Sequence, residues 1–289
     1  GETQDVTFTY TATDNDGAIS AEQMITITVT GINDAPTIGN VADFGFTEAA
    51  DASAQNLSAN GTVSFNDIDT TDLVDITSSL TSDAVFSGGG IDGSLKLLLE
   101  SGFSIGATVP GAADWAYTVN NANLDFLKEN ETITLTFTLT ATDSADATAY
   151  DTVTITITGT NDAPLITDGP DTAGLTETNA GLSTSGSLTV SDVDVSDVVT
   201  ASIDSVSASG NTGAATPDNA TLLAMFSINT TDILDSTENV NPLDWTFNSG
   251  TEAFDYLATG ETLILEYTVT ATDDDATLAN NSETVTITI

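Results

Sequence analysis

The stretch TITLTFTLTAT (residues 132–142) alternates Thr with apolar side chains, and TVTITITGTNDAP (152–164) repeats that alternation before a polar stop. Alternation at period two is typical of a β-strand with one buried face, and the β-branched residues Val, Ile and Thr suit a pleated surface. Pro ends a ladder of hydrogen bonds because it has no N–H to donate. The two runs therefore predict neighbouring strands followed by a linker.

The same pair of runs recurs in residues 1–36 and 259–289, which indicates a repeat with a period of about 130 residues. The part of the repeat that precedes these runs occurs twice. We therefore divide the chain into the last strands of a preceding repeat (1–31), a complete repeat (32–160) and a second repeat that lacks its own terminal linker (161–289). Because the sequence opens on a strand, we expect it to be a piece of a longer protein.

Many short strands separated by Gly, Asn and Asp clusters predict antiparallel sheets in an all-β fold of immunoglobulin-like sandwiches, arranged in a tandem, elongated array. Two apolar segments, LKLLLESG (95–102) and NATLLAMFSI (219–228), fit either short helical turns or buried strands. Trp115 and Trp245 occupy the same position in the two repeats. For both, packing in the core or at a pole is favoured over a role as a platform for sugars.

The charge balance excludes several classes of partner. The chain has 44 Asp plus Glu and 2 Lys plus Arg, which gives a formal net charge of -42. Nucleic acids and anionic lipid surfaces would repel such a chain.

Cys and His are absent, so thiolate and imidazole metal sites and the usual nucleophile–base pairs are excluded. No apolar run is long enough for a membrane-spanning helix.

Acidic residues recur at matching positions, each at a predicted strand end. They are Glu48 and Glu177; Asp67, Asp69, Asp192 and Asp194; Glu2, Glu131 and Glu261; and Asp14, Asp143 and Asp273. The loops of a sandwich gather at its two poles, so acids from adjoining repeats would converge where the repeats meet. Bare carboxylates repel by about 4 kcal/mol per pair at 4 Å and an effective dielectric constant near 20. A divalent cation removes that repulsion, and Ca²⁺ tolerates irregular oxygen ligands.

A single Asp-x-Asp turn is ordinarily a turn with solvated acids. The recurrence of five acidic motifs at matching offsets favours metal binding instead.

The pattern resembles the VCBS and cadherin-like repeats of large bacterial surface adhesins of the RTX type. The resemblance covers nearly the whole chain and is carried by TGTNDAP (158–164), TATD (140–143), LDFLKENETITL (124–135), FDYLATGETLIL (254–265) and GSLTVSDVDVSD (186–197). It implies a cadherin-like fold and an extracellular rod that calcium makes rigid.

The resemblance also implies two sets of calcium ligands. Around the first junction, the linker at residues 31–36, they would be Glu2, Asn33, Asp34, Asp67, Asp69 and Asp143. Around the second junction, the linker at residues 159–164, they would be Glu48, Glu131, Asn161, Asp162, Asp192, Asp194 and Asp273. Asp14, Glu177 and Glu261 are expected to serve junctions outside this sequence.

The linkers depart from the cadherin pattern in two places. Gly31 and Gly159 stand where cadherins have Asp, and Ala35 and Ala163 stand where they have Asn. The loop Asp of that pattern is also replaced, by Glu129 in one copy and by Thr259 in the other. We therefore expect fewer than three ions per junction.

Four functions remain open at this point. The leading one is a non-catalytic extender segment of a bacterial surface adhesin, whose partners are adjacent repeats of the same chain. The alternatives are a module that binds carbohydrate or protein on a host or biofilm surface, and a subunit that exchanges strands with copies of itself in an extracellular filament. The last, an enzyme with a carboxylate pair, is disfavoured because such pairs need an acid in a partly apolar cleft.

Overall fold

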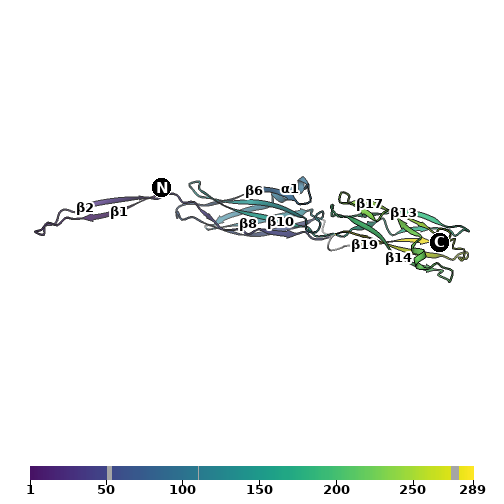
Figure 1. The fold of residues 1–289 in the computed structure, drawn as a ribbon. Coiled ribbons are helices and arrows are strands. Elements are labelled where there is room, and N and C mark those ends of the chain that lie inside the picture. The colour runs from purple at the N-terminus through teal and green to yellow at the C-terminus, as the bar shows by residue number, and fades with distance from the viewer. Residues whose placement is uncertain (51–53, 110, 275–279) are drawn as a thin grey trace.

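A computed structural model describes residues 1–50, 54–109, 111–274 and 280–289. Figure 1 shows an elongated molecule in which a hairpin projects from one end and two groups of sheets follow one another toward the C-terminus. Each group encloses its own hydrophobic core, one formed by residues between Val41 and Ile157 and the other by residues between Ile166 and Ile289. We call these groups the first and the second sandwich.

The hairpin is formed by β1 (Thr3–Tyr10) and β2 (Gln23–Thr30), which pair from Thr3↔Thr30 to Tyr10↔Gln23. All of its residues are exposed, including Phe8 and Ile25, which expose 54% and 51% of their surface. Paired residues lie on the same face of a two-stranded sheet, so Val6 and Ile27 join Phe8 and Ile25 in an exposed apolar face.

The first sandwich consists of one sheet in the order β4-β10-β9-β6 and one in the order β3-β5-β8-β7. Its strands are β3 (Thr37–Ile38), β4 (Phe44–Thr47), β5 (Gln55–Asn66), β6 (Asp75–Phe86), β7 (Phe103–Val109), β8 (Ala112–Ala122), β9 (Thr132–Thr142) and β10 (Thr148–Thr158). The alternation predicted for residues 132–142 is confirmed, because Ile133, Leu135 and Leu139 are buried and the Thr residues between them are partly exposed.

The second sandwich repeats this arrangement, with sheets in the orders β11-β13-β17-β15 and β12-β19-β18-β14-β16. Its strands are β11 (Leu165–Thr167), β12 (Asp171–Gly174), β13 (Ser183–Ser191), β14 (Val199–Gly210), β15 (Phe226–Ile228), β16 (Asp232–Leu234), β17 (Val240–Asn248), β18 (Leu263–Thr272) and β19 (Asn280–Thr288).

One strand pair in each sandwich is parallel, whereas the sequence predicts antiparallel strands. Strand β4 runs beside β10 from Phe44↔Ile155 to Thr47↔Thr158, and β12 runs beside β19 from Asp171↔Val285 to Gly174↔Thr288. In both sandwiches a short early segment of the repeat thus joins the sheet that contains the last strand of the same repeat.

The two undecided segments are partly helical. Helix α1 (Gly93–Glu100) begins where the Asp92 side chain accepts hydrogen bonds from the N–H groups of Ser94 and Leu95, which is a typical N-cap. The segment at residues 219–228 divides into helix α2 (Asn219–Leu223) and strand β15. In the described part of the chain, no helix is long and apolar enough to cross a bilayer.

The tryptophans pack as expected. The indole of Trp245 is 2% exposed and stacks on Phe226 with ring centroids 5.5 Å apart. Trp115 stacks between Phe44 and Phe103 at 5.2 and 5.8 Å. Each indole covers a glycine of the neighbouring strand, Gly186 for Trp245 and Gly61 for Trp115, and a Cβ on either glycine would lie within 3 Å of an indole carbon.

Candidate metal centre

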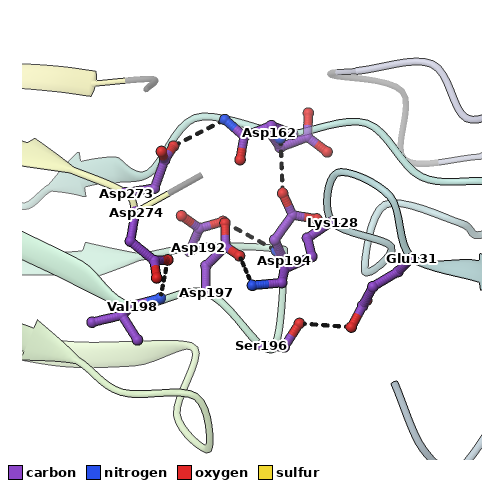
Figure 2. Close-up of polar contacts among 11 residues, drawn as sticks. Lys128, Glu131, Asp162, Asp192, Asp194, Ser196, Asp197, Val198, Asp273 and Asp274 are labelled. Carbon is purple, nitrogen blue, oxygen red and sulfur yellow. Dashed lines mark hydrogen bonds and ion pairs between the residues drawn. The ribbon is translucent and has the colours of Figure 1, made fainter. Parts of the chain in front are cut away.

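The second linker brings Asn161 and Asp162 against the loops of the second sandwich, and Figure 2 shows Asp162 beside Asp194. The Asn161 amide donates to Asp273 Oδ2 at 3.0 Å, and the Asp162 backbone N–H donates to Asp194 Oδ2 at 2.8 Å. Asp273 directly follows β18, and Asp194 lies three residues after β13. The linker is thereby tied to two strand ends of the sandwich that follows it.

The loop after β13 turns its carboxylates inward. The N–H of Asp194 donates to Asp192 Oδ1 at 3.0 Å, and the N–H of Asp197 donates to the carbonyl of Asp194 at 3.0 Å. These local bonds form a tight turn, in which Asp192, Asp194 and Asp197 expose only 4%, 2% and 1% of their surface. The turn therefore presents three acids to the interior of the junction and not to the solvent.

The first sandwich covers the other side of the junction. Glu48 is 3% exposed, and its Oε2 accepts hydrogen bonds from the N–H and the hydroxyl of Thr160. The Ser196 hydroxyl donates to Glu131 Oε1 at 3.0 Å, which connects the second sandwich to the loop before β9. Lys128 Nζ lies 3.3 Å from Asp197 Oδ1, again across the junction.

Two groups of carboxylates at the second junction are close enough to share cations. One consists of Glu48, Asp125 and Asp162, and the other of Asp192, Asp197 and Asp273. In each group, one oxygen from every residue lies within 4.8 Å of the others. At that distance a pair of unit charges repels by about 3.5 kcal/mol for an effective dielectric constant of 20. Unless a cation lies among them, the charged carboxylates of each group repel one another and destabilise the folded chain.

The raised pKa values at this junction have the same origin. Burial, together with the neighbouring Asp197 and Asp192 carboxylates, raises the pKa of Asp194 to about 8, although the hydrogen bond from the Asp162 N–H opposes the change. Burial likewise raises the pKa of Asp192 to about 6. The pKa of Glu48 is raised by burial and by Asp162 and Asp125, although hydrogen bonds from Thr160 oppose the change. These acids thus take up either protons or cations more readily than solvated carboxylates.

The donor set fits a calcium ion. Glu48 Oε1, Asp192 Oδ2 and Asp194 Oδ1 are buried and have no hydrogen-bond partner. Buried polar atoms are normally paired, so these unpaired oxygens beside the two carboxylate groups are suited to bind a cation. All the available ligand atoms are oxygens, which suit Ca²⁺ and not the transition metals that prefer nitrogen or sulfur.

Two of the acids at the second junction were not among the expected ligands. Asp125 and Asp197 both stand in the clusters, and their counterparts at the same repeat positions are Asp255 and Asp72. Their recurrence was a usable signal, since each lies within a stretch that carries the family resemblance. They were missed because they match no position of the cadherin ligand pattern.

The first junction repeats the geometry but is more open. Asn33 donates to Asp143 Oδ2 at 2.9 Å, and the Asp34 N–H donates to Asp69 Oδ2 at 2.8 Å. Asp67 and Asp143 form a carboxylate group with Asp72, which sequence reasoning also missed. The Asn33 hydrogen bond lowers the pKa of Asp143.

Glu2 is exposed and lies outside that group, but it lines a hollow together with Asn33, Asp69 and Asp72. Asp34 is exposed, unlike the buried Asp162.

The acids expected to serve other junctions lie at outer positions. Glu177 shares a hydrogen bond with Asp255, which raises the pKa of Glu177. These two residues are the counterparts of Glu48 and Asp125, at the far end of the second sandwich. Asp14 lies in the hairpin turn, where its Oδ1 accepts from the N–H groups of Asp16 and Ala18.

Comparisons with known proteins give structural likeness only. No protein-family model matches the chain, and no curated protein matches it. The crystal structure of protocadherin gamma C5 EC1-3 is 14% identical, with a TM-score of 0.41, over 93% of this chain and 73% of that one. Mouse clustered PcdhgC3 EC1-3 is 15% identical, with a TM-score of 0.40, over 99% and 76%.

The protocadherin gamma B2 extracellular cadherin domains 1-5 are 14% identical, with a TM-score of 0.46, over 98% of this chain. This chain spans 45% of that longer structure. Because the scores and identities are low, the interpretation of the junctions rests on their own geometry.

Proposed function

We propose that this chain is a non-catalytic extender segment of a bacterial surface adhesin, made of tandem cadherin-like repeats that calcium holds in line. Residues 1–31, 32–160 and 161–289 are its successive repeat units. Its partners are neighbouring repeats of the same chain, and it works outside the cell, where calcium is abundant. Its role is to set the distance and stiffness between an anchor and a binding head.

The observation that carries this proposal is the set of buried carboxylates at the second junction. They come from both sandwiches and the linker, and Glu48, Asp192 and Asp194 keep buried oxygens without partners. Glu48 and Asp125 would hold an ion together with Asp162, and Asp192 and Asp273 would hold one together with Asp197. A bound ion would supply the positive charge that lets these groups stay together, and so would fix one sandwich relative to the other.

The test combines small-angle scattering with calorimetry on the full chain. With calcium, we expect a longer, stiffer particle and a higher melting temperature than with EGTA, and magnesium should restore little of either. The double variant D125N/D192N, which neutralises one acid in each group, should lose most of the calcium response. Asp244, exposed on β17, provides a matched control, because D244N removes a charge from the same sandwich far from any cluster. Identical particle length and melting temperature with and without calcium would overturn the proposal.

The acids of the second junction do not favour an enzyme. Asp192 and Asp194 do have raised pKa values, which a general acid requires. However, they expose 4% and 2% of their surface, which leaves no room for a sugar ring to contact both. Hydrolase activity that is abolished by D194N and kept by D244N would reverse this conclusion.

The hairpin favours a second candidate, strand exchange in an extracellular filament. In β9 and β10, which occupy the same repeat position, Phe137 and Val153 are 3% and 0% exposed, whereas their counterparts Phe8 and Ile25 in the hairpin are more than half exposed. Such a face can be covered by strands from another copy. Light scattering should then show a mass that grows with concentration, and a monomer at all concentrations would exclude this candidate.

A further inference from the structure

Lys128 is one of only two basic residues in the chain, and it lies at the centre of the second junction. Its ammonium group is 3.3 Å from Asp197 Oδ1, and the Asp197 side chain is 0% exposed. Lys128 belongs to the loop before β9 in the first sandwich, while Asp197 belongs to the turn after β13 in the second (Figure 2). The ion pair therefore joins the two sandwiches directly.

The lysine is not required by the sandwich fold. In the second repeat, the equivalent position of LDFLKENET is Ala258 in FDYLATGET. The acid that Lys128 contacts, by contrast, has a counterpart in the first repeat, since Asp72 occupies the position of Asp197. The acid is present in both repeats, whereas the lysine of the first repeat is replaced by alanine in the second.

The ammonium group competes with a divalent ion for the same carboxylate. Asp197 belongs to one of the two groups that would hold calcium, together with Asp192 and Asp273. Calcium lies about 2.3–2.6 Å from its oxygen ligands. An ion bound to Asp197 would therefore lie close to Lys128, and the two positive charges would repel each other.

We propose that Lys128 is a built-in cation that replaces part of the calcium at this junction. It lowers the affinity of the Asp192–Asp197–Asp273 group for calcium, and it keeps the two sandwiches in contact when calcium is removed. The group formed by Glu48, Asp125 and Asp162 is left as the stronger site. This inference rests on the proposed calcium role of the junction, and it adds a residue that sets how strongly the junction depends on calcium.

The decisive variant is K128A, which copies the residue found at position 258. We expect the weakest calcium site measured by titration calorimetry to bind at least tenfold more tightly in K128A than in the unmodified chain. A tenfold change corresponds to about 1.4 kcal/mol. Equilibrium dialysis at a fixed low calcium concentration should show correspondingly more bound calcium.

A second readout does not depend on loaded calcium. In EGTA, K128A should melt below the unmodified chain, because a buried Asp197 loses its ion pair with the Lys128 ammonium group. In millimolar calcium the deficit should disappear or reverse. A residue with a purely packing role would lower the melting temperature equally in both conditions.

Lys96 offers a matched control, since it lies on α1, pairs with Asp83 and Glu100, and carries the only other positive side chain. K96A changes the net charge by the same amount and should leave the calcium affinity within twofold. K128R keeps the charge and should behave like the unmodified chain, whereas K128Q, which keeps most of the length, should behave like K128A.

The outcomes separate the two proposals. If the unmodified chain and K128A both bind calcium with the same number of ions and the same affinities, the role of Lys128 is overturned and the calcium junction stands. If neither binds calcium, the calcium junction itself is overturned. A melting deficit of K128A that is as large in calcium as in EGTA would also refute the built-in cation.

Discussion

Removing calcium should reverse the way in which stability depends on pH. In the metal-free chain, the carboxylates of the second junction must share a small volume, with oxygens of each group within 4.8 Å of one another. Each fully charged pair costs about 3.5 kcal/mol at an effective dielectric constant of 20. Protonation relieves this repulsion, so the metal-free protein should become more stable as the solution is acidified from pH 8 to pH 5.

The sign follows from the pKa values of two aspartates. Burial raises the pKa of Asp194 to about 8 and that of Asp192 to about 6, whereas an unfolded Asp titrates near 3.9. Between these limits the folded chain binds more protons than the unfolded chain. The contribution of these two aspartates to stability is therefore fully present below about pH 4 and is lost as the pH rises toward 8. The free energy of unfolding falls by up to about 1.4 kcal/mol per pH unit for each proton that the folded chain binds in excess.

Calcium should produce the opposite trend, because protons and calcium compete for the same carboxylates. The assay is a series of calorimetric melts from pH 5 to pH 8, in EGTA and in millimolar calcium. D194N should flatten the EGTA curve, and D244N should leave it unchanged. A melting temperature in EGTA that stays level or rises from pH 5 to pH 8 would refute the reasoning.

Three smaller predictions test packing and the hairpin. G186A places a Cβ 2.4 Å from a ring carbon of Trp245, so denaturant unfolding should show a loss of about 1–3 kcal/mol, whereas G90A, with no atom within 4 Å, should be nearly neutral. The Tyr267 hydroxyl donates to a carbonyl of helix α2 at 2.9 Å in the core, and Y267F should cost about 1 kcal/mol in the same assay, a prediction that an unchanged midpoint would contradict. F8S should abolish any self-association seen by light scattering without changing the melting of the sandwiches, and equal association of both proteins would exclude the apolar hairpin face as its cause.

The strands were predictable because their signal is local. In a strand, alternate side chains lie on the same face, so the apolar residues at positions 132–142 all lie on the face that is buried. This pattern can be recognised without knowledge of the rest of the chain. Helix α1 was not predictable as a helix, because LKLLLE is a short, Leu-rich segment that also fits a buried strand. The N-cap at Asp92 was the available signal. The parallel pairing of β4 with β10 depends on contacts between residues far apart in sequence, which no local pattern encodes.

At the junctions, too, some features could be predicted from the sequence and others depend on contacts between distant residues. Repeat positions alone place Asn161 and Asp162 near Asp192 and Asp194, and the structure brings these residues into contact range. The burial of the linker could not be predicted, since the Asn33-Asp34 linker has the same residues as Asn161-Asp162 but is exposed. The contact between Lys128 and Asp197 joins the two sandwiches, so it could not be predicted from the sequence. The sequence showed only that Lys128 is one of two basic residues.

The parallel pairs have a mechanical consequence. The chain enters the first sandwich ahead of β4 and leaves it after β10, and these two strands run side by side in the same direction. A pull on the two ends therefore drags the paired strands in opposite senses and loads all the hydrogen bonds between them at once, as shear. Antiparallel hairpin strands pulled apart from their open end would give way one bond at a time. The β12–β19 pair has the same arrangement in the second sandwich, so both units should resist stretching along the axis of the molecule.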